Sequence, residues 1–137
     1  MIKLLSRFVV MVSLVMVLSC TSDTTSDLVI NTLPDRDLML SWNTVTRYMS
    51  DECIVGDIQY TLYYGNQSGV HPITLEIPSV SIECSHTTYD TQCGVFKMRC
   101  SYILTDVPKN NWYFTLTATD EAGNESAKSN EVNVLLQ

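Results

Sequence analysis

The sequence predicts an all-β protein, a β-sandwich, and three features of its pattern carry this prediction. Beyond residue 27, apolar and polar residues alternate with a period of two in several short runs, as in strands with one buried face. Turn-forming pairs such as Pro34-Asp35 and Gly65-Asn66 lie between the runs, and no helical period occurs there. We therefore expect strands at residues 28–33, 38–42, 58–64, 73–77, 80–84, 96–104, 112–119 and 132–134.

The apolar members of each run define the face that should be buried. In chain order they are Leu38, Leu40 and Trp42; Ile58, Tyr60, Leu62 and Tyr64; Ile73, Leu75 and Ile77; Val80, Ile82 and Cys84; Phe96, Met98, Cys100, Tyr102 and Leu104; Trp112, Phe114, Leu116 and Ala118. The segment 43–56 is mostly polar and contains Cys53, which predicts a long surface loop. Residues 120–124 predict a turn, because Gly123 can adopt a positive φ at little cost.

The last third of the chain resembles the end of a fibronectin type III domain. The residues that carry the resemblance are Leu104, Val107-Pro108, Trp112-Tyr113-Phe114, Ala118, TDEAGNES and SNEV, with weaker support from LMLSWN and YTLYYGNQSG upstream. It covers most of the chain after about Leu28 and implies a fibronectin type III or immunoglobulin-like sandwich over residues 28–137. Trp112 occupies the place where the family has a tyrosine that bonds back across a corner. An indole donates a hydrogen bond but accepts none, so we expect the corner with altered bonding.

The first twenty residues resemble the leader of a bacterial lipoprotein. Lys3 and Arg7 precede an apolar run from Phe8 to Leu18, which is too short to span a bilayer and suits a signal-peptide core. Val17-Leu18-Ser19-Cys20 is similar to a lipobox, in which the cysteine is lipidated and becomes the new N-terminus. The prediction is a signal peptide over 1–19 and lipid, such as palmitate, on Cys20. An ordinary secretory signal and an uncleaved anchor are the alternatives.

Residues 20–27 should then be the lipidated cysteine and a solvated tether, since Thr21 to Asp27 offer no apolar side chain to bury. In enterobacterial lipoproteins an aspartate after the lipidated cysteine favours the inner membrane. Thr21 stands there, which favours the outer membrane of the cell envelope.

The charge balance bears on the class of partner. The chain has eight basic and 15 acidic residues, a formal charge of −7, and loss of Lys3 and Arg7 with the leader makes it −9. No cluster of lysine and arginine occurs, which argues against nucleic-acid binding and against direct contact with anionic lipid headgroups. The lipid on Cys20 would then be the group that holds the protein on the membrane.

Four cysteines remain once Cys20 is assigned to lipid, and an even number in an exported protein predicts two disulfides. If residues 82–84 pair antiparallel with residues 100–102, Cys84 faces Cys100 and the apolar residues share one side. Cys53 then meets Cys93 at the hairpin tip. The competing pairing, Cys84–Cys93 with Cys53–Cys100, stays open. A zinc site is disfavoured because no CxxC pair occurs.

The sequence does not favour an enzyme, and no cofactor motif is present. His71 and His86 are the only histidines, and Ser85-His86 are neighbours on a strand, where successive side chains point to opposite faces. Asp51-Glu52 and Asp120-Glu121 are typical of solvated loop acids.

Four tyrosines, Tyr48, Tyr63, Tyr89 and Tyr113, fall on loops or on the polar phase of strands. Tyrosine gives contact area with a polar tip, although outward tyrosines also simply suit strands. If Cys53 and Cys93 join, the loops 43–56 and 87–94 form one patch with Tyr48, Tyr89, Asp51, Glu52 and Asp90. We therefore expect a membrane-anchored binding module with a protein partner. A carbohydrate or cell-wall binder and a phage-encoded lipoprotein that blocks a surface receptor are the alternatives.

Overall fold

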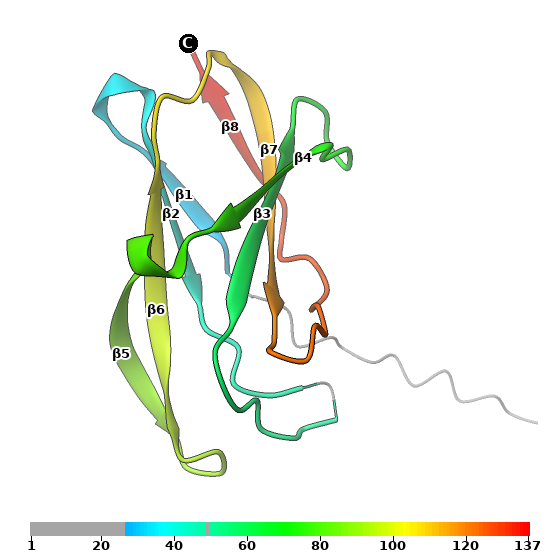
Figure 1. Cartoon of the computed structure of the whole chain (residues 1–137). Helices are drawn as coiled ribbons and strands as arrows, with labels where there is room; N and C mark the ends of the chain where they lie inside the picture. Colours follow the sequence, from blue (N-terminus) through cyan, green and yellow to red (C-terminus); the bar gives the residue numbers. More distant parts are fainter. Residues whose placement is uncertain (1–26, 49) are drawn as a thin grey trace, which may run out of the picture.

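The computed structural model describes residues 27–48 and 50–137, and these form a sandwich of two antiparallel four-stranded sheets (Figure 1). One sheet has the order β1 (Val29–Thr32), β2 (Leu38–Asn43), β6 (Val95–Leu104), β5 (Glu83–Asp90). The other has the order β4 (Ile73–Ile77), β3 (Gln59–Gly65), β7 (Asn110–Thr119), β8 (Val132–Leu136). Two 3-10 turns, η1 (Pro34–Arg36) and η2 (Ser79–Ser81), complete the elements. The prediction of an all-β protein with a β-sandwich fold is confirmed.

The core lies between the sheets and consists of the apolar phase of the predicted strands. Trp42 on β2 and Phe114 on β7 are fully buried, and the Trp42 ring packs on Tyr60 of β3 with centroids 5.0 Å apart. Leu38, Leu40, Leu62, Ile77 and Leu116 are also fully buried. Burying each such side chain stabilises the fold by roughly 1.5–3 kcal/mol. The period of two therefore identified the core-facing residues of the central strands.

The predicted register of the β5–β6 hairpin is confirmed at the cysteines. Cys84 lies directly opposite Cys100, and the two form a disulfide with a Cα–Cα distance of 4.1 Å. The expected strand at 80–84 is wrong in its first half. Residues 79–81 form η2, Val80 is 94% exposed rather than opposite Leu104, and β5 begins only at Glu83. The chain crosses from one sheet to the other here, and the Ser81 amide closes this bend by donating to the Pro78 carbonyl.

The corner before β7 is held by the tryptophan. Trp112 is 8% exposed, and its indole Nε1 donates a hydrogen bond of 2.7 Å to the Pro108 carbonyl. An indole can donate a hydrogen bond but cannot accept one, and this bond uses that donor. The β6–β7 connection is thereby fixed to the start of β7.

The two ends of the sandwich carry different connections. One end, called here the loop end, bears the β2–β3 loop (44–58), the β5–β6 turn (91–94) and the β7–β8 loop (120–131). The opposite end, called the turn end, bears residues 33–37, 66–72 and 105–109, and the C-terminus lies there (Figure 1).

Candidate functional site

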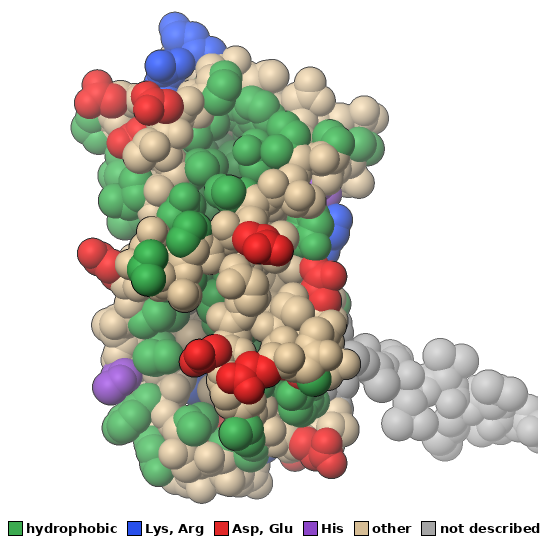
Figure 2. All heavy atoms as spheres, in the orientation of Figure 1, with side chains coloured by type: hydrophobic (Ala, Val, Ile, Leu, Met, Phe, Trp, Pro, Cys, Tyr) green, Lys and Arg blue, Asp and Glu red, His purple; other side chains and the backbone are tan. Residues whose placement is uncertain are grey.

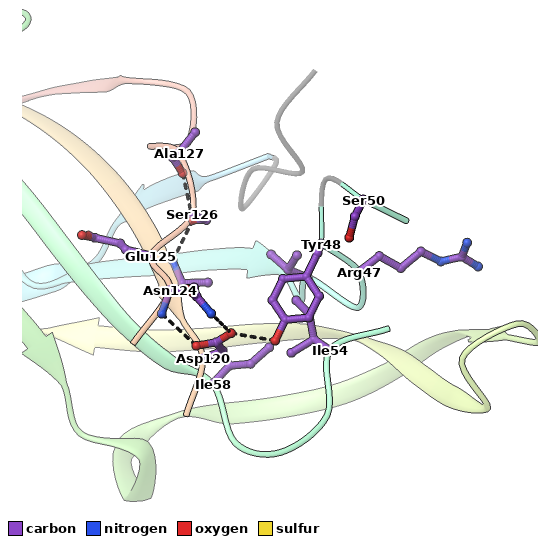
Figure 3. Close-up of a pocket in the computed structure, with 12 residues that line it drawn as sticks. Arg47, Tyr48, Ser50, Ile54, Ile58, Asp120, Asn124, Glu125, Ser126 and Ala127 are labelled. Atoms are coloured by element: carbon purple, nitrogen blue, oxygen red, sulfur yellow. Dashed lines mark hydrogen bonds between the residues drawn. The ribbon is translucent and has the colours of Figure 1, made fainter. Parts of the chain in front are cut away.

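A pocket of about 370 Å³ opens at the loop end, between the β2–β3 loop and the β7–β8 loop (Figure 3). This volume lies within the range of small-ligand sites. The lining residues come from these two loops and the strand ends beside them: Val45, Arg47, Tyr48, Ser50, Ile54, Ile58, Ala118, Asp120, Asn124, Glu125, Ser126 and Ala127. The site is therefore built from segments about 70 residues apart in the sequence.

The walls of the pocket are apolar and its edge is polar. Val45 and Ala118 are buried, and Ile54 and Ile58 are half-buried and pack against the core. Tyr48 reaches from the β2–β3 loop toward the β7–β8 loop, and its hydroxyl donates a hydrogen bond of 2.6 Å to Asp120 Oδ2 (Figure 3). This bond bridges the two loops that form the pocket.

Asp120 is the carboxylate at the edge of the pocket. It also accepts hydrogen bonds from the Asn124 backbone amide at 2.8 Å and from Asn124 Nδ2 at 2.9 Å. The Tyr48 hydroxyl and the two Asn124 donors stabilise the anion and lower the pKa of Asp120 to about 2. The same contact with Asp120 raises the pKa of Tyr48. At neutral pH the edge therefore carries a fixed negative charge beside a neutral phenol.

A charged pair fixes the β2–β3 loop to the β5–β6 hairpin. Arg47 donates to Asp90 through Nη2 at 2.7 Å and Nε at 3.1 Å, and Thr46 Oγ1 donates to the same carboxylate at 3.2 Å. The Gln92 and Cys93 amides also donate to Asp90 Oδ1. Together these donors hold the pKa of Asp90 well below its usual range, with Arg47 the largest cause.

The expectation that Asp90 lies on the contact surface is wrong. Asp90 is 7% exposed, and its carboxylate accepts five hydrogen bonds. Asp90 acts instead as the anchor point of the β5–β6 turn. Asp51 is exposed, as expected, and accepts from Arg47 Nη1 at 2.8 Å.

The second disulfide joins the same two segments. Cys53 in the β2–β3 loop is bonded to Cys93 in the β5–β6 turn, with a Cα–Cα distance of 5.4 Å. The favoured pairing of the four cysteines is thus confirmed. A covalent bond and a charged pair together hold the β2–β3 loop against the hairpin.

Tyr89 does not share a patch with Tyr48 in the way the sequence suggested. Strand β5 runs as far as Asp90, so the expected loop at 87–94 is a strand as far as residue 90 and a turn over 91–94. Tyr89 is 53% exposed and lies against Phe96 across the hairpin, with ring centroids 4.9 Å apart. It does not line the pocket.

The sequence reasoning missed an exposed group of rings on this hairpin. The His86 ring stacks on Phe96 with centroids 4.4 Å apart, and Phe96 is 49% exposed. Figure 2 shows apolar side chains gathered beside a histidine over the β5–β6 hairpin, at the lower left. Phe96 has the same phase as Met98 and Cys100 and was expected to be buried. The hairpin extends past the opposite sheet, so its last inward-phase rings stay uncovered (Figure 1).

Tyr63 and Tyr113 lie on the outer face of the other sheet and are both half-buried. The Tyr63 hydroxyl donates to Glu125 Oε1 at 2.5 Å, and Lys128 Nζ lies 4.7 Å from its ring centroid. The Tyr113 hydroxyl accepts from Asn111 Nδ2 at 3.1 Å. Lys128 therefore covers part of the Tyr63 face that a ligand would use.

The lipidation site predicted at Cys20 lies outside the described residues. Within residues 27–48 and 50–137, no cluster of three or more histidine, cysteine or acidic side chains is suited to a metal ion. The same residues contain no helix long and apolar enough to cross a membrane. His71 Nε2 lies 2.8 Å from Glu131 Oε2, and this contact links the β3–β4 turn to the residue before β8.

Comparison with known proteins supports the fold only. No family model matches the chain, and no match was found among curated proteins. Among solved structures, the chain is similar to Astrotactin-2, a vertebrate-specific, perforin-like membrane protein involved in neuronal development. The TM-score is 0.51 at 16% sequence identity, over 82% of this chain and 22% of that one. The similarity therefore concerns one part of a much larger protein.

Proposed function

We propose that this protein is a non-enzymatic binding module, held on a bacterial envelope membrane by lipid on Cys20, and that its loop end contacts a protein partner. The leader supports the anchor, because Val17-Leu18-Ser19-Cys20 is similar to a lipobox and follows an apolar run of signal-peptide length. The resemblance to fibronectin type III domains supports a role in binding rather than in catalysis.

The observation that carries the assignment to the loop end is the pocket between two fixed loops. The Cys53–Cys93 disulfide and the Arg47–Asp90 pair hold the β2–β3 loop, and the Tyr48–Asp120 bond joins it to the β7–β8 loop. Loops fixed before binding lose less conformational entropy when the partner arrives. Binding residues commonly lie on loops carried by a rigid scaffold.

Capture from envelope extracts tests the assignment, with the full-length chain as bait in detergent and under oxidising conditions. Tyr48→Ala should abolish capture of the partner that the wild type retains, because Tyr48 forms one side of the pocket. Tyr63→Ala removes a similar half-buried tyrosine from the sheet face and is the matched control. Loss of capture with Tyr63→Ala but not with Tyr48→Ala would move the contact surface to the sheet.

The anchor requires a separate test. Wild-type protein should enter the detergent phase, and Cys20→Ala should leave it, with the mature N-terminus of the wild type at a lipid-modified Cys20. Mass spectrometry of the N-terminal peptide gives the answer directly. Unmodified Cys20 in the mature protein, or cleavage at another residue, would refute the lipoprotein assignment.

Carbohydrate binding is the second candidate, and the ring group on the β5–β6 hairpin is the observation that favours it. Exposed aromatic faces offer stacking area for sugar rings, and Phe96 and Tyr89 are each about half exposed. Phe96→Ala should then abolish sedimentation of the protein with purified cell-wall glycan, whereas Tyr113→Ala should not. Equal sedimentation of wild type and Phe96→Ala would remove this candidate.

A further inference from the structure

The apolar walls of the pocket at the loop end favour a ligand with an apolar part. Val45, Ile54, Ile58 and Ala118 provide walls that consist of methyl and methylene groups. Such walls favour burial of a hydrocarbon chain by roughly 25 cal/mol for each Å² removed from water. A fully polar ligand would lose hydration there without gaining partners.

The edge of the pocket is suited to a positive charge. The Asp120 carboxylate lies at this edge, and the Tyr48 ring stands beside it. The Tyr48 hydroxyl donates a hydrogen bond to the Asp120 carboxylate, which makes the Tyr48 ring more electron-rich. A cation at this position meets a carboxylate and an aromatic face together, and both attract it.

Among the described residues, Arg47 is the one lysine or arginine that lines the pocket, and its charge is already neutralised. The Arg47 guanidinium donates to Asp90 and to Asp51, with nitrogen–oxygen distances of 2.7 and 2.8 Å. Figure 3 shows its charged end pointing away from Tyr48 and Asp120. Arg47 therefore does not neutralise the Asp120 carboxylate at the pocket edge.

The wider loop end has the same sign of charge. Residues 44–58 contain three acidic residues and one basic residue, and residues 120–128 contain three acidic residues and one basic residue. Lys128, the basic residue of the second loop, lies over the Tyr63 ring on the sheet face. The field around the pocket therefore attracts cations and repels anions.

We propose that this pocket binds a hydrocarbon stem that ends in an ammonium or guanidinium group, as in a lysine or arginine side chain of the protein partner. The stem lies along Ile54, Ile58 and Ala118, and the cationic end lies beside the Tyr48–Asp120 hydrogen bond, within reach of the ring face and the carboxylate. This inference rests on the proposed binding function and names the chemistry of its partner. A free organic amine shares that chemistry and is separated from a protein side chain in the test.

The test is a methyl NMR titration of the full-length chain in detergent micelles with three small probes. These are lysine capped as its acetyl and methylamide derivatives, n-pentylammonium and n-pentanol. The two cations should shift the Ile54 and Ile58 methyl signals saturably, with dissociation constants of about 1–10 mM, as expected for fragments this small. Pentanol, which has the stem without the charge, should bind about tenfold more weakly or not at all. Tighter binding of the capped lysine assigns the site to a protein side chain, and tighter binding of pentylammonium assigns it to a free amine.

Two variants that each remove one negative charge test whether the Asp120 carboxylate binds the cation. Asp120→Asn should weaken both cations about tenfold or more, whereas Glu76→Gln on β4, away from the pocket, should leave them unchanged. Unchanged Leu62 and Val134 methyl signals confirm that each variant is folded. Rising salt should weaken wild-type binding and have little effect on Asp120→Asn.

Three results would overturn the inference: equal binding of pentanol and pentylammonium, equal cation binding by wild type and Asp120→Asn, or no saturable shift of either isoleucine. The proposed function has a different failure. If Tyr48→Ala abolishes partner capture while the cations do not bind, the loop end is the contact surface and only the ligand chemistry is wrong.

Discussion

The two ends of the sandwich are held by different kinds of contact. At the turn end, the described residues are linked by hydrogen bonds without a disulfide: Val107 N donates to Arg36 O, the Trp112 indole donates to the Pro108 carbonyl, and Ser68 Oγ and Gly69 N donate to the Glu131 carboxylate. At the loop end, side chains make the links, through one disulfide, one charged pair and the Tyr48–Asp120 hydrogen bond. The loop end therefore depends on oxidation as well as on ionised carboxylates, whereas the links of the turn end do not depend on oxidation.

This difference shows how a small sandwich can present long loops without losing their shape. The β2–β3 loop has no regular secondary structure over most of its length, so no continuous ladder of backbone hydrogen bonds fixes it. Links to two other segments replace that ladder. A rigid loop end is useful for contact with a partner, and the turn end shows that this fold can close one end without a disulfide.

The largest expected effect comes from removal of the long-range disulfide. Chain-entropy arguments give about 4 kcal/mol for the Cys53–Cys93 bond and about 3 kcal/mol for Cys84–Cys100, because the first spans 40 residues and the second 16. Replacing Cys53 and Cys93 with serine should lower the free energy of unfolding and raise hydrogen exchange at 44–58. Replacing Cys84 and Cys100 with alanine should leave exchange at 44–58 much less affected. Equal exchange in both pairs of variants would contradict a loop end held by its own disulfide.

Acid should weaken the loop end before the rest of the fold. The folded-state pKa of Asp90 lies well below the unfolded value of about 3.9, and that of Asp120 is about 2. A depressed pKa contributes stability that is full above the unfolded value and is lost as pH falls through the folded one. Denaturant unfolding should therefore give a constant free energy above about pH 5 and a decline from about pH 4 toward pH 2.

Asp90→Asn is the variant that isolates this pH dependence. It removes the charge that pairs with Arg47, so the protein should be less stable at pH 7 and its decline below about pH 4 should be shallower. Asp106→Asn at the turn end is the control, and its decline should match the wild type. A decline in Asp90→Asn as steep as in the wild type would show that other carboxylates cause it.

At the turn end a single hydrogen bond gives a smaller effect. Trp112→Phe keeps an aromatic ring but removes the indole donor to Pro108, and the expected cost is about 1–2 kcal/mol. Thermal unfolding with and without reductant measures it. The cost should be the same in both conditions, since this corner has no link to either disulfide; a cost that changes on reduction would mean that the two ends are coupled.

The smallest expected effect on stability is that of Tyr48→Phe, which removes one hydrogen bond near the surface. Its effect on Asp120 should be clear, because the Tyr48 hydroxyl is the largest cause of the low pKa of that carboxylate. NMR titration of the Asp120 side-chain carbon should show a pKa that rises from about 2 toward the ordinary value of about 3.9. An unchanged pKa would assign the shift to the Asn124 and Ala122 donors.

The sequence predicts the strands well because each strand has one buried face. Alternation placed Trp42, Leu62 and Phe114 in the core, and the same alternation put Cys84 opposite Cys100. It failed at Val80, where the chain crosses between sheets and alternating residues no longer share one sheet.

The site was only partly predictable for a related reason. Cysteine parity and strand register brought Cys53 to Cys93, and the glycine at 123 predicted the turn at 120–124. Loop residues have no period, so nothing in the sequence showed that Asp90 is buried against Arg47 or that Tyr48 reaches Asp120. The exposed Phe96 was missed because alternation says which face a side chain takes, not whether another sheet covers that face.

The central claim, that the loop end contacts the partner, is tested most directly by photo-cross-linking in living cells. Val55 and Leu135 suit the comparison because both are exposed aliphatic residues, 82% and 59% respectively, one on the β2–β3 loop and one on β8 near the turn end. A photoreactive amino acid at position 55 should give one defined adduct, and the same amino acid at position 135 should give none. A defined adduct from position 135 alone, equal yields from both positions or no adduct from either would contradict the claim.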